Sequence, residues 1–130
     1  MQNVQIKISS HIEQSDNIDD IQEEVNGQWD EQHQILIYKQ NGLENVLEIN
    51  GNKVTINQNN ATKLNFEHQK ETRSLLSTQY GYIDILVYDQ EVNFSLLESN
   101  SGILILNYSL RQEVNPLGSF QLKLQFEPIV

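Results

Sequence analysis

The strongest constraint on the fold of this chain is the regular alternation of apolar and polar side chains near its C-terminus. A β-strand places successive side chains on opposite faces, so the pattern predicts a strand over residues 119–127 with one buried and one solvated face. Such strands are typical of antiparallel sheets that are covered on one side. Phe120, Leu122, Leu124 and Phe126 alternate there with Gln121, Lys123, Gln125 and Glu127.

The same alternation recurs along the chain. Residues 3–12 predict a strand with Val4, Ile6, Ile8 and Ile12 on one face, and Ile103–Leu106 predicts a central strand that is covered on both faces at its start. Turn signals separate the segments, and Asn50-Gly51-Asn52 predicts a hairpin through the positive φ angles of a type I′ turn. About nine to eleven strands at this spacing favour an all-β barrel or sandwich. The further segments are 33–39, 45–50, 53–58, 62–68, 72–79, 82–89 and 91–98.

Composition supports an all-β domain. The chain has 15 asparagines and 15 glutamines but only one alanine, Ala61, a balance unfavourable for helices. At 130 residues it is long enough for one hydrophobic core and too short for two ordinary ones, so a single domain over residues 1–130 is expected.

The charge of the chain excludes several classes of function. Eight basic and 18 acidic residues give a formal net charge of −10, which disfavours binding to nucleic acid or to an anionic membrane. There is no cysteine, so disulfides and cysteine-ligated metals are excluded. The N-terminus lacks the pattern of a signal peptide and no apolar run is long enough to cross a membrane. We therefore expect a cytoplasmic protein without cofactor or metal.

The sequence contains no recognisable motif of catalytic residues. His11, His33 and His68 are isolated and are interpreted as surface histidines, and there is no nucleophile elbow or glycine-rich phosphate loop. The acidic run at residues 15–24 lacks the glycine and glutamate that an EF-hand loop requires, and predicts an acidic hairpin leading into a solvated strand. Enzymatic activity is therefore not expected.

Tyrosines are the strongest candidates for a binding site. Tyr38, Tyr80 and Tyr108 lie in or beside predicted strands, and inside a small barrel their polar tips could line a ligand cavity; the alternative is that they are ordinary core or rim aromatics. Arg73 adjoins an apolar run, where it could anchor a carboxylate from inside or serve as a surface cation.

The C-terminal two-thirds of the sequence resemble the YwiB-like family, catalogued as domain of unknown function 1934 and found in Gram-positive bacteria. The resemblance rests on Thr78-Gln79-Tyr80-Gly81, followed by Gly102-Ile103-Leu104-Ile105-Leu106-Asn107-Tyr108-Ser109-Leu110. Upstream, Gly27-Gln28-Trp29 matches the glycine and aromatic residue of the family's second strand and is similar to the lipocalin Gly-x-Trp signature. Leu76 departs from the family pattern, which has tyrosine there.

The resemblance implies a calycin-like, or lipocalin-like, antiparallel β-barrel of about eight to ten strands, and no reaction. Strand phase and the family pattern together predict that Thr78, Tyr80 and Tyr108 line the interior. Three functions remain open: a barrel that binds a small, partly apolar ligand without catalysis, an acidic protein-interaction or regulatory module and, least favoured, an enzyme. The ligand-binding function is tested by whether the interior is hollow, which would favour it, or filled by Phe66, Phe94, Phe120 and Phe126, which would count against it. A homodimer through an exposed strand edge is a further possibility.

Overall fold

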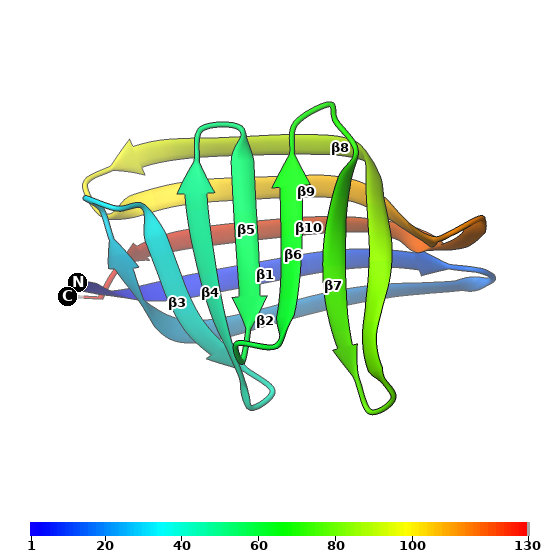
Figure 1. Ribbon diagram of the computed structural model, residues 1–130. Helices are drawn as coiled ribbons and strands as arrows, with labels where there is room; N and C mark the ends of the chain where they lie inside the picture. Colours follow the sequence, from blue (N-terminus) through cyan, green and yellow to red (C-terminus); the bar gives the residue numbers. More distant parts are fainter. Residues whose placement is uncertain (130) are drawn as a thin grey trace.

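The structure is a computed structural model that describes residues 1–129. Ten antiparallel strands follow one another in chain order and close into a barrel, because β1 pairs with β10 (Figure 1). The strands are β1 (Gln2–Gln14), β2 (Asn17–Asp30), β3 (Ile35–Gln40), β4 (Leu43–Asn50), β5 (Lys53–Gln58), β6 (Thr62–Glu67), β7 (Thr72–Thr78), β8 (Gly81–Glu98), β9 (Ser101–Gln112) and β10 (Asn115–Pro128). The all-β fold and the strand number expected from the sequence are confirmed.

The barrel is flattened into two crossing layers. In Figure 1, β3 to β7 form the front layer, and β1, β9 and β10 cross behind it. The long strand β8 belongs to both layers, since its first half pairs with β7 and the rest pairs with β9. It bends at Asp89, whose φ of 50° accompanies a register shift between Tyr88 and Glu91. The sequence predicted two strands here, and the structure has one bulged strand instead.

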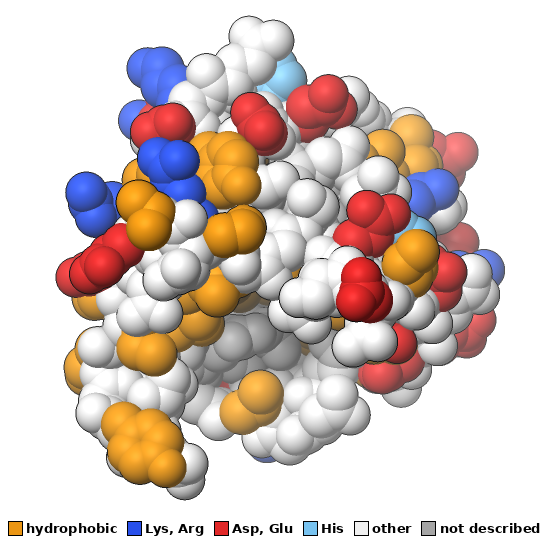
Figure 2. All heavy atoms as spheres, turned by 90° about the vertical axis from the view of Figure 1, so that its right-hand side faces the viewer, with side chains coloured by type: hydrophobic (Ala, Val, Ile, Leu, Met, Phe, Trp, Pro, Cys, Tyr) orange, Lys and Arg blue, Asp and Glu red, His pale blue; other side chains and the backbone are white. Residues whose placement is uncertain are grey.

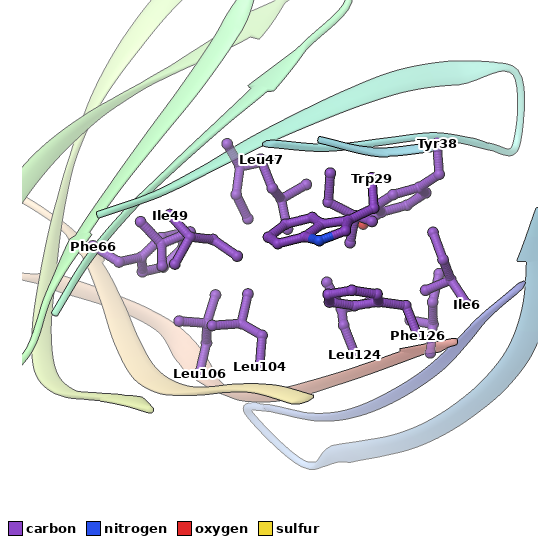
Figure 3. Packing of buried hydrophobic residues seen from close by; sticks show 14 of the residues in the cluster. Ile6, Trp29, Tyr38, Leu47, Ile49, Phe66, Leu104, Leu106, Leu124 and Phe126 are labelled. Carbon is purple, nitrogen blue, oxygen red and sulfur yellow. The ribbon is translucent and has the colours of Figure 1, made fainter. Parts of the chain in front are cut away.

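Alternation places the apolar side chains inside. Ile6 lies opposite Phe126 and Val25, and Ile8 lies opposite Leu124, so the buried faces of β1, β2 and β10 meet in register. Trp29 is fully buried at the centre of the view in Figure 3, with Tyr38 beside it and Phe126 below.

Aromatic rings fill the interior in two groups. Trp29 packs on Phe126 with ring centroids 4.7 Å apart and on Phe94 at 5.9 Å. The second group is Phe66, Tyr108 and Phe120, with Tyr108 lying 4.7 Å from Phe66 and 5.3 Å from Phe120. All four phenylalanines therefore pack in the interior, which is filled by aromatic rings rather than hollow.

The seam between β6 and β7 is the weakest part of the strand pairing. A single residue pair, Lys63 and Leu75, aligns across it. Side-chain hydroxyls take the place of backbone hydrogen bonds between these two strands. Ser74 Oγ accepts a hydrogen bond from the backbone N–H of Asn65 at 2.9 Å, and Thr62 Oγ1 accepts one from the backbone N–H of Ser77 at 3.0 Å. The barrel is thus closed at this seam partly by side chains.

The hairpin between β4 and β5 differs in detail from the prediction. Its two-residue loop is Gly51-Asn52, and only Gly51 has a positive φ, of 62°. Glycine at the first central position with a negative φ after it is the pattern of a type II′ turn rather than type I′.

Candidate functional site

Two of the predicted site residues, Tyr38 and Tyr108, lie inside the barrel near one another. Tyr38 is only 5% exposed, on the inward side of β3, and Tyr108 lies on the inward side of β9 between two phenylalanine rings. Burial raises the pKa of each phenol to about 12, and the nearby Tyr108 adds to the rise at Tyr38. Both hydroxyls are therefore neutral near pH 7 and can donate a hydrogen bond.

Neither hydroxyl takes part in a hydrogen bond with any group among residues 1–129, and desolvation rather than hydrogen bonding dominates both pKa shifts. Buried phenol groups usually have a partner in the protein or in ordered water. The enclosed side-chain polar atom without a partner among residues 1–129 is Trp29 Nε1, so the two phenol oxygens retain access to solvent and are free to bind a molecule that reaches them.

A group of polar side chains faces inward on the strands beside Tyr38. Asn45 lies directly opposite Tyr38 on β4 and is 3% exposed. Its side-chain oxygen accepts a hydrogen bond from Gln58 Nε2 at 3.0 Å. Gln40 Nε2 donates to Glu23 Oε2, also at 3.0 Å, and Glu23 is inward because it pairs with the buried Ile8. These four residues were missed from the sequence, although Asn45 and Gln58 continue the inward phase of their strands.

This end of the barrel is open to solvent. Several inward-facing residues here are only half-buried, whereas Trp29 is fully buried. The half-buried residues are Tyr108, Phe120, Leu122, Gln40 and Gln58. Figure 2 looks onto the end that carries the β1–β2 and β9–β10 turns, and the surface there is hollowed in the lower half of the view. We call the inward-facing group of Tyr38, Tyr108 and the four polar residues the open end of the barrel.

Three predicted site residues are placed elsewhere. Tyr80 is 91% exposed in the turn between β7 and β8, because the strand ends at Thr78 and the alternation does not continue into the turn. Thr78 Oγ1 donates to Gly81 O at 2.7 Å and accepts from Tyr80 N–H at 3.1 Å, so its hydroxyl holds the turn. Arg73 lies on the outer face of β7, opposite Leu86, and so does not point inward. The expectation that Tyr80 lines the interior was wrong, and of the two alternatives for Arg73 the structure has the surface position.

A second hollow lies on the outer wall across β2, β1, β10 and β9. This groove of about 590 Å³ is lined in part by His11, Asp20, Asn107 and Lys123. His11 is held between two carboxylates, with Nδ1 2.6 Å from Asp20 Oδ1 and Nε2 3.0 Å from Glu13 Oε1. Both hydrogen bonds raise the pKa of His11. Because both ring nitrogens are engaged, His11 has no free nitrogen with which to activate a nucleophile.

No three His, Asp or Glu side chains within residues 1–129 are grouped so that they could hold a metal ion. The described residues also include no helix long and apolar enough to cross a membrane.

The fold and this site define a closed, ten-stranded antiparallel β-barrel with a polar, aromatic open end. The family model of the domain of unknown function DUF1934 matches residues 6–124, so the chain belongs to that family. The crystal structure of the ywiB protein from Bacillus subtilis has a similar fold, with a TM-score of 0.75 over 99% of this chain and 93% of that chain. The two sequences are 11% identical, so this similarity shows the fold alone. The sequence matches none of the curated proteins.

Proposed function

We propose that the chain is a cytoplasmic binding protein that holds a small, partly apolar molecule at the open end of its barrel and does not transform it. The observation that carries the proposal is the pair of inward-facing hydroxyls, Tyr38 and Tyr108, without a hydrogen-bond partner among residues 1–129. Tyr108 packs between the aromatic rings of Phe66 and Phe120, which offer an apolar wall. A few polar groups within an apolar lining are typical of small-molecule sites.

The packed core limits the size and position of the ligand. Trp29 and Phe126 fill the interior beside Tyr38 (Figure 3), so the molecule would lie on the solvent side of the two tyrosines rather than deep in the barrel. The likeness to calycin-type barrels, which rests on fold-level analogy, is consistent with this position. We expect a compact ligand with one ring or short chain and one hydrogen-bond acceptor.

The absence of catalysis is part of the proposal. With a pKa of about 12, the phenols of Tyr38 and Tyr108 are weak bases at neutral pH and act as hydrogen-bond donors. The nearby carboxylate, Glu23, already accepts a hydrogen bond from Gln40. These groups can orient a ligand but supply no pair of nucleophile and base.

The proposal is tested with the neutral dye Nile red and with native mass spectrometry of the gently purified protein. We expect dye fluorescence to rise on binding, and binding to weaken by roughly 30-fold in Tyr38→Phe/Tyr108→Phe, because two hydrogen bonds of about 1 kcal/mol each are lost. The control is Tyr80→Phe, which removes an exposed hydroxyl. Equal binding by all three proteins would refute a site at these tyrosines. A co-purified mass that leaves on unfolding, and is lost from the double variant, would support it.

The acidic interaction module remains the second candidate, and the β1–β2 hairpin favours it. Asp16 and Asp19 are exposed near the tip, and Ile18 between them is 64% exposed. Neither carboxylate takes part in an ion pair with another residue in the range 1–129. A partner for this hairpin would need cationic and apolar groups.

A further inference from the structure

Both arginines of this acidic chain line one groove on the outer wall. Arg73 on β7 and Arg111 on β9 border a hollow of about 480 Å³ together with Tyr82, Asp84 and Glu113. Leu86 on β8 lies opposite both arginines in the strand pairing, which explains their proximity. We call this hollow the arginine groove.

The arginines have no carboxylate partner in the described part of the chain. The ion pairs found among residues 1–129 involve only His11, His33, Lys53 and Lys70 as cations. Arg111 instead stacks on Tyr88, with its guanidinium carbon 5.2 Å from the ring centroid. In a chain with 18 acidic residues, two unpaired arginines in one groove indicate a site for carboxylates from outside.

Apolar side chains border the arginine groove. Tyr82 lines the groove and is 65% exposed. Outside the lining, Leu75 on β7 is 42% exposed, and Val114, which follows the lining residue Glu113, is 88% exposed. Arginine and tyrosine among exposed apolar groups are typical of protein interfaces. Asp84 and Glu113 also line this groove, so a partner must place its carboxylates at the two guanidinium groups and away from these two acids.

The β1–β2 hairpin of the same chain has the complementary chemistry. It presents the carboxylates of Asp16 and Asp19 beside the exposed Ile18. The two carboxylates match the charge of Arg73 and Arg111, and Ile18 matches the apolar surface of Tyr82 and Leu86 in the groove. A second copy of the chain therefore carries the partner that the arginine groove requires.

The placement of the two surfaces permits a symmetric pair. The β1–β2 turn and the β9–β10 turn, which borders the groove, project at the same end of the barrel (Figure 1). Viewed onto that end, Lys and Arg side chains lie mostly toward the left, among hydrophobic ones and some Asp and Glu, while most Asp and Glu side chains lie toward the right (Figure 2). Rotation by a two-fold axis in the plane of contact brings the left of one copy against the right of the other.

We propose that two copies of this chain associate end to end, with the β1–β2 hairpin of each copy bound in the arginine groove of the other. The contact uses side chains, because barrel closure pairs every strand of the described chain on both edges. This differs from the strand-edge dimer considered from the sequence, and it does not depend on the ligand proposal.

Sedimentation velocity of the whole protein over a wide concentration range at physiological ionic strength tests the proposal. We expect a monomer–dimer equilibrium that Arg73→Glu/Arg111→Glu and Asp16→Lys/Asp19→Lys each abolish. Mixing these two variants should give a one-to-one heterodimer. In it the native hairpin of the arginine variant binds the native groove of the aspartate variant, and the second contact pairs the introduced lysines with the introduced glutamates. The control is Lys7→Glu/Lys39→Glu, which makes the same change in net charge at exposed lysines outside the groove and should leave the dimer unchanged.

Several outcomes overturn the proposal. A wild-type protein that stays monomeric at every concentration excludes the contact. A dimer that persists in the arginine variant, or variants that fail to combine on mixing, excludes these surfaces as its basis. Circular dichroism of each variant verifies folding, which is expected because all four residues are exposed or only half-buried.

Discussion

The side-chain carbonyl of Gln90 accepts a hydrogen bond of 2.9 Å from the backbone N–H of Glu67 and so ties the bend of β8 to the end of β6. The amide of the same side chain donates to Lys70 O at 2.8 Å and to Thr72 Oγ1 at 2.9 Å. Gln90 is 3% exposed. One buried side chain therefore connects β8 with both sides of the weak seam between β6 and β7.

Replacing Gln90 with alanine should destabilise the barrel by about 2–4 kcal/mol, because several buried backbone groups lose their partner without regaining water. Urea unfolding monitored by Trp29 fluorescence measures the change. Gln121→Ala is the matched control: Gln121 is exposed on the outer face of β10, and its loss should cost about 0.5 kcal/mol or less. Equal midpoints for the two variants would show that the seam does not depend on Gln90.

Gly27→Ala should destabilise the protein more than an ordinary surface substitution. A Cβ at Gly27 would lie 2.4 Å from the backbone oxygen of Ile37 and 2.8 Å from Ile6 Cδ1. The backbone of β3 would have to move, at a cost of about 1–3 kcal/mol or more. Gly51→Ala serves as comparison, since nothing lies within 4 Å of its Cβ and only its φ of 62° is strained. Thermal unfolding of both proteins should give the lower Tm for Gly27→Ala.

The two buried tyrosines should make the barrel sensitive to alkali. Their folded-state pKa is raised from 10.0 to about 12, so their contribution to stability is complete below pH 10 and is lost as the pH rises to about 12. Within that range the free energy of unfolding should fall by about 1.4 kcal/mol per pH unit for each phenol. Urea unfolding across this range, repeated on Tyr38→Phe, should show a shallower slope in the variant. An unchanged slope would contradict the burial of Tyr38.

His11 should titrate above its ordinary pKa of 6.5, because hydrogen bonds to Asp20 and then Glu13 favour its protonated form. Its contribution to stability is therefore complete below pH 6.5 and is lost as the pH rises through the raised folded-state pKa. Proton NMR of the imidazole measures the pKa directly. Asp20→Asn should bring it down toward 6.5, whereas Asp19→Asn, next in sequence and outside the contacts of His11, should have little effect. A pKa that does not respond to Asp20→Asn would contradict the geometry.

Most of the fold could be predicted because alternation is a local property. The phase of Ile6, Ile8, Leu124 and Phe126 alone places these side chains inside, and the structure confirms it. The bend at Asp89 could not be recognised in this way. Asp89-Gln90 has the composition of a turn, and Gln90 is held inward by groups about 20 residues away in sequence.

The candidate site was predicted only in part. Tyr38 and Tyr108 follow the inward phase of their strands and were identified, whereas Tyr80 lies just beyond the end of β7, where phase loses its meaning. Asn45 and Gln58 were overlooked because amides are usually surface residues, although each occupies an inward position beside buried aliphatic ones. At these two positions the alternation of the strand predicted the direction of the side chain better than the residue type did.

The pairing of β1 with β10 also governs how the chain reaches its native state during synthesis. β1 leaves the ribosome first, yet the edge that it offers to β10 stays unpaired until residues 115–128 have emerged. Until then β1 and the newest strand present open backbone edges and half-covered apolar faces, which neighbouring nascent chains can bind. Ribosome-stalled chains that lack β10 should therefore depend on chaperones, and release of the last strand completes the barrel in one cooperative step.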